Sequence, residues 1–218
     1  MGTPVIAAII PAYNEEKNIA SVIRALKGSA SISEIIVVDD GSRDDTARLA
    51  SLEGARVIRQ ANIGKAGAMA AGARSTRADI LFFADADLVG FTSKHASAVV
   101  DPVVRGVAGM SVGIRGWGRI PLWVMQHCVP VIGGERAILR EHFLKIAAHR
   151  AAVRYGIETV MNAYCARHRI PVILVRMHGV SLIRKEQKIG WAAGFCARLR
   201  MFGQIVRTEL ILLFNRNW

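Results

Sequence analysis

Four short apolar runs divide the first ninety residues of the chain, and continuous runs of this length are typical of strands covered on both faces. They lie at residues 5–10, 35–38, 56–58 and 80–84. Between them, apolar side chains recur at spacings of three and four, which predicts helices. These stretches cover residues 14–27, 42–52 and 64–76. Strands that alternate with helices predict an α/β fold with a mostly parallel central sheet flanked by helices.

Polar residues mark the expected starts of the first two helices. Asn14 is predicted to cap the first helix, with Glu15 and Glu16 in the first turn, where the helix dipole favours acidic side chains. Ser42 and Asp45 stand three residues apart and predict a capping box at the second helix.

The second half of the chain is less regular. Residues 93–106 and 157–168 have helical patterns, residues 110–113 and 172–177 are predicted strands, and residues 133–137 form a glycine-rich turn. No linker and no internal repeat interrupts the chain. We therefore expect one catalytic domain over residues 1–180 and a helical tail over residues 181–218.

The tail carries an apolar stripe at helical spacing, with arginines beside it, and this pattern predicts a basic amphipathic helix. The stripe consists of Trp191, Phe195, Leu199, Phe202, Val206, Leu210 and Leu213. Three interpretations stay open. The helix rests on an anionic membrane surface, it packs on the catalytic domain, or it contacts a second subunit in a homodimer.

Composition narrows the function classes. The net charge is +12, which predicts an anionic partner. Nucleic acid is not that partner, because no aromatic stacking set and no recognition helix are present. The three cysteines show no metal or disulfide spacing and indicate reduced core thiols. No signal peptide and no apolar run of about 20 residues is present. We therefore expect a cytoplasmic protein, at most peripheral to the inner face of the membrane.

Two carboxylates follow the apolar run at residues 80–84. Asp85 and Asp87 are two residues apart, so extended backbone places both on one side. Such a pair can face one hard cation, and a cation there would neutralise a diphosphate leaving group. A pair of solvated loop aspartates that cap the next helix is the alternative interpretation.

Two further clusters follow predicted strands. Asp40 precedes Gly41 and Ser42, and it can accept from a base or a ribose while Gly41 turns the chain. Gly64 and Lys65 stand at a helix start, where N–H groups and a cation suit a phosphate. In open α/β sheets ligands bind beyond the carboxyl ends of the strands, where all of these clusters are expected.

Taken in order, these motifs resemble family 2 glycosyltransferases of the GT-A fold. The resemblance covers residues 4–90 and continues more loosely into the second half. It is carried by Pro11-Ala12-Tyr13-Asn14-Glu15-Glu16, Val37-Val38-Asp39-Asp40-Gly41-Ser42, Asn62-Ile63-Gly64-Lys65-Ala66-Gly67, Asp85-Ala86-Asp87, Gly133-Gly134-Glu135-Arg136-Ala137 and Tyr155-Gly156-Ile157-Glu158. Small members such as polyprenyl-phosphate glycosyltransferases and glucosyl-phosphoglycerate synthases are the most similar.

The resemblance implies a UDP- or GDP-sugar donor, Mg²⁺ or Mn²⁺ as cofactor, and inversion at the anomeric carbon. Asp85 would meet the ribose or sugar, and Asp87 the metal. His178, after the strand 172–177, is the candidate third metal ligand beside these two. The implied donor-binding residues are Pro11, Ala12, Tyr13, Glu15, Asp40, Ser42, Gly64, Lys65, Asp85, Ala86 and Asp87.

On the acceptor side the resemblance implies Gly134, Arg136 and Glu158. Arg136 would clamp an acceptor or donor phosphate, and a solvated loop arginine is the alternative. Glu158 would act as catalytic base or contact the acceptor, with Asp87 as the other catalytic residue. A carboxylate that serves only the helix dipole is the alternative for Glu158.

The expected activity is transfer of the sugar to a lipid-linked or phosphorylated acceptor. Two alternatives stay open. One is a soluble glycosyltransferase with a small acceptor such as phosphoglycerate, and the other is a non-catalytic protein that binds nucleotide sugars.

Overall fold

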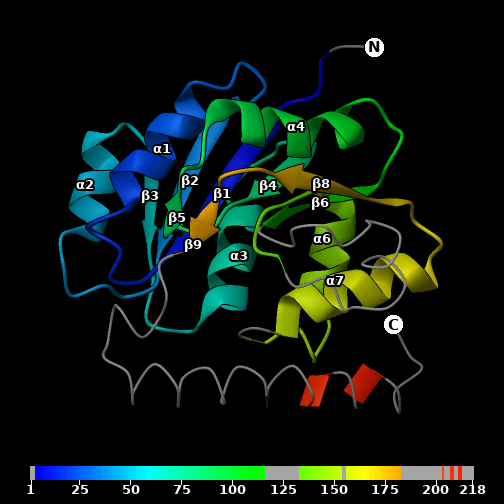
Figure 1. Ribbon diagram of the computed structural model, residues 1–218. Coiled ribbons are helices and arrows are strands. Elements are labelled where there is room, and N and C mark those ends of the chain that lie inside the picture. Colours follow the sequence, from blue (N-terminus) through cyan, green and yellow to red (C-terminus); the bar gives the residue numbers. More distant parts are fainter. Residues whose placement is uncertain are drawn as a thin grey trace.

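A computed structural model describes residues 3–115, 133–153 and 156–182, together with residues 203, 207, 208, 211 and 212 (Figure 1). Its centre is a seven-stranded sheet in the order β3-β2-β1-β4-β7-β6-β8, and β5 and β9 form a separate pair. The strands are β1 (Ile6–Ala12), β2 (Glu34–Asp39), β3 (Arg56–Arg59), β4 (Ile80–Phe83), β5 (Leu88–Val89), β6 (Met110–Arg115), β7 (Arg136–Leu139), β8 (Val172–Met177) and β9 (Ser181–Leu182).

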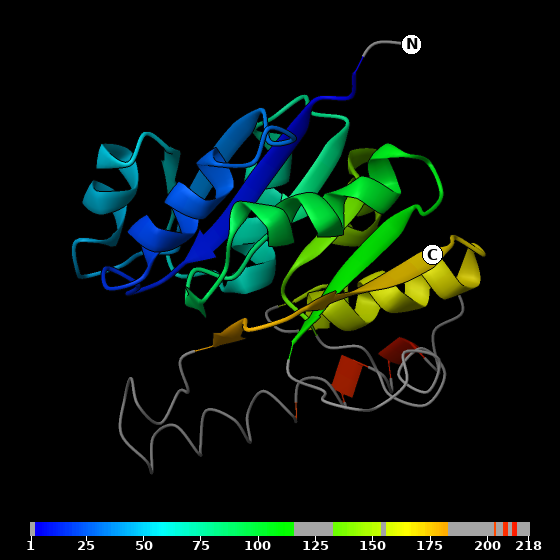
Figure 2. The ribbon, with the colours of Figure 1, turned by 45° about the horizontal axis from the view of Figure 1, so that its top comes forward.

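Helices cover both faces of the sheet. Those described are α1 (Ile19–Lys27), α2 (Thr46–Leu52), α3 (Lys65–Arg74), α4 (Ser93–Val104), α6 (Arg140–Ala147) and α7 (Gly156–Arg167). The helices α1, α2 and α4 lie on one face, and α3, α6 and α7 lie on the other (Figures 1 and 2). Burial of both faces explains why strands such as β4 read as unbroken apolar runs.

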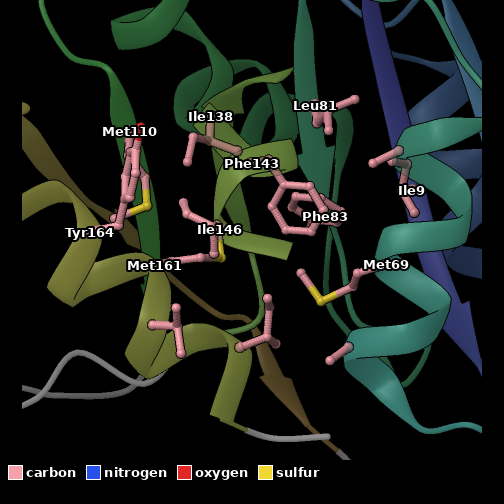
Figure 3. Close-up of a cluster of buried hydrophobic side chains, with 14 of the residues drawn as sticks. Ile9, Met69, Leu81, Phe83, Met110, Ile138, Phe143, Ile146, Met161 and Tyr164 are labelled. Carbon is pink, nitrogen blue, oxygen red and sulfur yellow. The ribbon is translucent and has the colours of Figure 1, made fainter. Parts of the chain in front are cut away.

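The core under α3, α6 and α7 is built from strand residues and helix residues that meet side by side (Figure 3). Phe83 of β4 packs on Phe143 of α6 with ring centroids 4.5 Å apart. Cys165 of α7 is buried here, and burial raises the pKa of its thiol to about 11. The prediction of a reduced core thiol is confirmed for this cysteine.

One strand of the large sheet runs against the others. β7 pairs antiparallel with both β4 and β6, whereas the remaining described pairs of the sheet are parallel. The start of β7 therefore meets the carboxyl ends of β4 and β6, because Arg136 pairs with Phe83 and Val112. This reversal delivers residues 133–136 to the edge where the parallel strands end.

The predicted α/β fold is confirmed, but two predicted helix starts are wrong. α1 begins at Ile19, and Asn14 has a φ of +55°, which lies in the left-handed region and not in a helix cap. α2 begins at Thr46, so Ser42 and Asp45 form no capping box. Both polar segments instead build loops, as described below.

The pattern also missed elements in the second half. Residues 133–137 are not only a turn, because β7 begins at Arg136 and α6 follows it without a break. The strand predicted over residues 110–113 continues to Arg115. This extension matters because it brings an arginine to the same edge as the start of β7.

Parts of the predicted tail contact the domain predicted over residues 1–180. β9 pairs with β5, so residues 181–182 lie beside Leu88 and Val89. Thr208 is buried, and a Cβ added at Gly156 of α7 would meet its hydroxyl. Ile211 and Leu212 pack against the core cluster of Figure 3. All seven residues of the predicted apolar stripe, such as Leu199, lie outside the described residues. Within the described part of the chain, no helix combines the length and apolarity that a membrane span requires.

Candidate active site

The predicted polar clusters converge at one edge of the sheet. The parallel strands β1, β2, β4 and β6 end there, and the reversed strand β7 starts there. The first turns of α3 and α7 also carry side chains to this edge, because Lys65 of α3 and Glu158 of α7 meet there. Topology thus assembles residues that are far apart in the chain, such as Lys65 and Glu158, which are separated by 93 positions.

Two loops on one side of this edge hold each other through hydrogen bonds. The backbone N–H of Asn14 donates to Ser42 Oγ, and the N–H of Arg43 donates back to Asn14 Oδ1, both at 2.9 Å. The N–H of Glu15 donates to Thr46 Oγ1 at 2.7 Å. The residues predicted as helix caps therefore pin the loop after β1 to the loop after β2.

Asp40 holds a third loop to the same frame. Its Oδ1 accepts from Gln60 Nε2 at 2.7 Å and from the N–H of Ile63 at 2.9 Å, and its Oδ2 accepts from the N–H of Gly64 at 2.8 Å. Asp40 is buried, so these bonds offset the cost of its desolvation. A base that contacts Asp40 would have to share a carboxylate that already organises the loop before α3.

The remaining residues predicted for the nucleoside lie along this frame. At the end of β1, Pro11 is partly exposed and Ala12 is buried. Tyr13, the next residue, is 44% exposed. Glu15 is half-buried and accepts from Asn18 Nδ2 at 3.3 Å. An exposed aromatic ring at the end of a strand offers a flat apolar face on which a base can stack.

Asp85 and Asp87 follow β4 with the alternation that the sequence predicts. Both are partly exposed, whereas Ala86 and Leu88 are buried. Ala86 and Asp87 lie in a turn after β4, so a shared direction of the two carboxylates stays a prediction. Neither aspartate is fully exposed.

Lys65 joins this segment to α7. Its Nζ lies 2.7 Å from Asp85 Oδ1 and 2.7 Å from Glu158 Oε1. The three side chains are 16%, 18% and 8% exposed, so the ion pairs are partly shielded from water. Burial alone would lower the pKa of Lys65, but the charges of Asp85 and Glu158 outweigh it and raise that pKa above its usual range. Lys65 is a cation at this edge.

A second cation flanks Asp85. Arg115, at the end of β6, places Nη1 2.6 Å from Glu135 Oε1 and 3.8 Å from Asp85 Oδ2. Glu135 is fully buried, and its Oε2 has no hydrogen-bond partner among the described residues. Burial and the charge of Asp85 raise the pKa of Glu135 to about 8, although Arg115 opposes the shift.

Gly134 is required by close packing at this point. A Cβ added there would overlap the carboxylate of Asp85. The predicted acceptor-side glycine is thus buried against the first acid of the pair. Its place explains why residue 134 has no side chain: any larger residue would displace Asp85.

The structure does not support Arg136 as a surface clamp for a phosphate. Arg136 is fully buried in β7, where Nε donates to the carbonyl of Gly133 at 2.8 Å and Nη1 donates to Asn162 Oδ1 at 2.6 Å. It is not a solvated loop arginine either. The reason is the reversed strand, which turns residue 136 into the sheet and not toward the acceptor side.

The predicted metal triad is not assembled. Across residues 3–115, 133–153, 156–182 and the five described tail positions, no three or more His, Cys, Asp or Glu side chains are grouped to hold a metal ion. His178 is exposed in the turn after β8. Its neighbour Gly179 does approach the acidic segment, because a Cβ added at Gly90 would collide with its carbonyl oxygen.

Sequence reasoning missed Arg115 and Glu135 as site residues. Glu135 stands inside the motif Gly133-Gly134-Glu135-Arg136-Ala137 but was passed over between two predicted acceptor contacts. Arg115 was missed because the predicted strand stopped two residues too early. A charged residue at a strand end, with an acid beside a glycine pair, is the signal that could have found both.

Comparison with known proteins identifies relatives of this chain. Glucosyl-3-phosphoglycerate synthase of Mycobacterium tuberculosis is 33% identical over 177 residues, which cover 76% of this chain and 54% of that protein. The undecaprenyl-phosphate 4-deoxy-4-formamido-L-arabinose transferase of Pseudomonas fluorescens is 37% identical over 94 residues, which cover 38% of this chain and 28% of that protein. The chain thus spans less than two thirds of the length of these curated relatives.

A solved structure agrees with the sequence matches. The Mycobacterium tuberculosis glucosyl-3-phosphoglycerate synthase in complex with Mn²⁺, UDP and glucosyl-3-phosphoglycerate superimposes with a TM-score of 0.79 at 25% identity. The match covers 96% of this chain and 80% of that one. The family model described as glycosyl transferase family 2 matches residues 7–143, which include β1, the acidic pair and the start of β7. The chain belongs to glycosyl transferase family 2, as its motifs implied.

Proposed function

We propose that this chain is a metal-assisted glycosyltransferase that moves a sugar from a UDP-sugar to a small phosphorylated acceptor such as phosphoglycerate. The observation that carries the proposal is the edge described above, where the paired acids Asp85 and Asp87 lie among Lys65, Arg115 and Glu158. Family membership and the Mycobacterium tuberculosis synthase, solved with Mn²⁺, UDP and a phosphorylated product, support it.

Mg²⁺ or Mn²⁺ fits the donor set that the chain offers. Both metals prefer oxygen ligands, and Mg²⁺ is commonly bound by one or two carboxylates together with substrate phosphates. Asp87 and Asp85 supply two carboxylates, so a third protein ligand is not required. When bound, the cation would supply charge stabilisation for the departing diphosphate.

The side chains divide the remaining tasks. The loop frame held by Asp40 and Ser42, together with Pro11, Ala12, Tyr13 and Glu15, would seat the nucleoside. Gly64 is the N-cap of α3 and Lys65 is its first residue, so both would lie near the donor diphosphate. Ala86 lies buried between the two acids in the chain.

Glu158 would take a proton from an acceptor hydroxyl. It sits in the first turn of α7 and is partly shielded from water, with Oε1 bonded to Lys65. An anionic phosphate acceptor would need no such base. Proton removal by Glu158 is therefore proposed only for an acceptor that reacts through a hydroxyl group. Inversion at the anomeric carbon is part of the same proposal, and the NMR signal of the anomeric proton in the product tests it.

The test of the donor site is calorimetric titration of UDP with Mn²⁺ present. We expect wild-type protein to bind and Asp87→Ala to lose metal-dependent binding, because one of two carboxylates is gone. Asp101→Ala is the matched control, since Asp101 lies on α4 and pairs only with the exposed Arg105 among the described contacts. Equal binding by Asp87→Ala and wild type would contradict the assignment.

A second candidate is transfer to a polyprenyl phosphate at a cytoplasmic membrane surface. The match to the undecaprenyl-phosphate transferase and the net charge of +12 favour it. Product analysis with UDP-glucose and each acceptor in turn separates the two. Product only from the polyprenyl phosphate would replace phosphoglycerate as the acceptor class, and no product from any acceptor would leave the non-catalytic alternative.

A further inference from the structure

Glu135 is a buried acid that the proposed chemistry does not use. Its side chain is fully buried at the start of β7, and its Oε1 accepts from Arg115 Nη1 at 2.6 Å. Its backbone carbonyl accepts from the N–H of Gly113 at 2.8 Å, which fixes it against β6. A buried carboxylate is costly unless it has a function or a strong partner, and here the partner is a single guanidinium.

The same nitrogen of Arg115 faces two acids at different distances. It forms a hydrogen bond with Glu135, whereas the 3.8 Å distance to Asp85 Oδ2 exceeds a hydrogen bond and leaves only an ion pair. Asp85 also accepts from Lys65 on its Oδ1. Without Glu135, electrostatics would draw Arg115 the remaining distance onto Asp85, because both side chains are mostly buried and opposite charges attract more strongly away from water.

We propose that Glu135 is a positioning residue for donor binding, because it holds the Arg115 guanidinium back from Asp85. The inference rests on the proposed function, in which Asp85 and Asp87 face a divalent cation and a nucleoside diphosphate. Glu135 touches neither ligand. It acts through Arg115, by keeping a competing cation from closing on the first acid of the pair.

Mn²⁺ binding in the presence of UDP tests this proposal. The binding is monitored through the electron paramagnetic resonance signal of free Mn²⁺. Glu135→Leu removes the acceptor, and we expect Mn²⁺ affinity to fall roughly 10- to 100-fold, as for other residues that orient metal ligands. Glu135→Gln keeps an uncharged hydrogen-bond acceptor for Arg115, as a protonated Glu135 does, and should bind Mn²⁺ with an affinity close to that of wild type. The double variant Glu135→Leu/Arg115→Met removes the competing cation as well and should return to within about twofold of wild type.

The double variant separates positioning from a structural role. If Glu135 served only the fold, removing Arg115 would not restore Mn²⁺ affinity, so a double variant as weak as Glu135→Leu overturns the proposal. Wild-type affinity in Glu135→Leu also overturns it. If Glu135→Leu does not fold, the uncharged double variant decides alone: near wild-type binding supports the proposal, and lost binding refutes it. Absence of Mn²⁺ binding by wild type would instead refute the proposed function and this inference with it.

Discussion

The acidic side chains on the two sides of the site edge have different kinds of partner. On the nucleoside side, Asp39 and Asp40 accept mainly from backbone N–H groups, such as those of Ser42, Ile63 and Gly64. On the metal side, the described partners of Asp85, Glu135 and Glu158 are the side chains of Lys65 and Arg115. The acids on the nucleoside side are held by backbone groups, which cannot move independently of the chain. The acids on the metal side are held by side chains, which can change partner.

This difference teaches which part of the site is a frame and which part can respond to a ligand. Backbone donors cannot leave Asp40 without opening the loop before α3, so that carboxylate acts as structure. Lys65 can rotate toward a diphosphate while its acid partner turns to a cation. We therefore expect substitutions on the two sides to separate into effects on folding and effects on binding.

The largest expected effect comes from Lys65, which two acids share. Lys65→Met leaves Glu158 without its ion-pair partner and leaves Asp85 with only the more distant Arg115. Loss of one partner from a buried ion pair typically costs ~3–5 kcal/mol of unfolding free energy. Because Lys65 is 16% exposed, we expect the lower end of that range. Urea unfolding measures the loss, and UDP titration should show that binding is lost as well.

Arg48→Met is the matched control for Lys65. Arg48 pairs with Asp45 at 2.6 Å, but both side chains are more than half exposed. An exposed pair of this kind is screened by water and salt, so we expect no measurable change in the urea midpoint. Equal losses in the two variants would break the comparison, because burial would then not distinguish the two kinds of pair.

The next effect is a pH dependence that belongs to the metal side. Burial and Asp85 raise the pKa of Glu135 to about 8 from an ordinary value of 4.5, so the folded protein binds this proton more tightly than the unfolded chain. The resulting stability is fully present below pH 4.5 and is lost as the pH rises toward 8. Relative to Glu135→Gln, wild type should lose unfolding free energy over this interval. Parallel curves for the two proteins would refute the shift.

A smaller effect is expected on the nucleoside side. Asp40→Asn turns one acceptor into an amide donor that faces an N–H group, and an unmet buried hydrogen bond costs roughly 1–3 kcal/mol. Urea unfolding should show this loss. Asp79→Asn is the control, because Asp79 accepts from the N–H of Val5 at 2.8 Å in an exposed position. If Asp40→Asn lost UDP binding without any loss of stability, Asp40 would be a ligand contact and not a frame residue.

The sequence predicts the strands and most helices because both faces of the sheet are buried, which leaves clear apolar runs such as the one in β4. It does not predict where the first two helices begin. Asn14 and Ser42 are good caps by composition, but their partners lie 28 and 29 residues away in another loop. A local pattern cannot show such long-range hydrogen bonds.

The sequence predicted those site residues that directly follow a strand or begin a helix. Asp85, Asp87 and Lys65 follow parallel strands or begin a helix, and the structure places them at the expected edge. Arg136 was assigned wrongly and Glu135 was missed, because both depend on the reversed direction of β7. Strand direction follows from pairing across the sheet, and the short segment 136–139 carries no local signal for it.

The smallest expected effect separates shape from charge on the metal side. Gly134→Ala adds one methyl group, which would overlap the Asp85 carboxylate. The backbone of Gly134 is not left-handed, so alanine fits its conformation and the fold should survive. We expect UDP binding with Mn²⁺ to weaken about tenfold, or ~1.4 kcal/mol, while the urea midpoint changes little.

Gly28→Ala is the control, because Gly28 has a φ of −73° and an added Cβ would lie 3.3 Å from Ser93 Cβ, away from the site. It should leave UDP binding unchanged. Weak binding with an intact fold in Gly134→Ala would show that Asp85 must keep its place as well as its charge. Unchanged binding would mean that the acid can move without loss, and the cations around it would then not be positioned for a ligand.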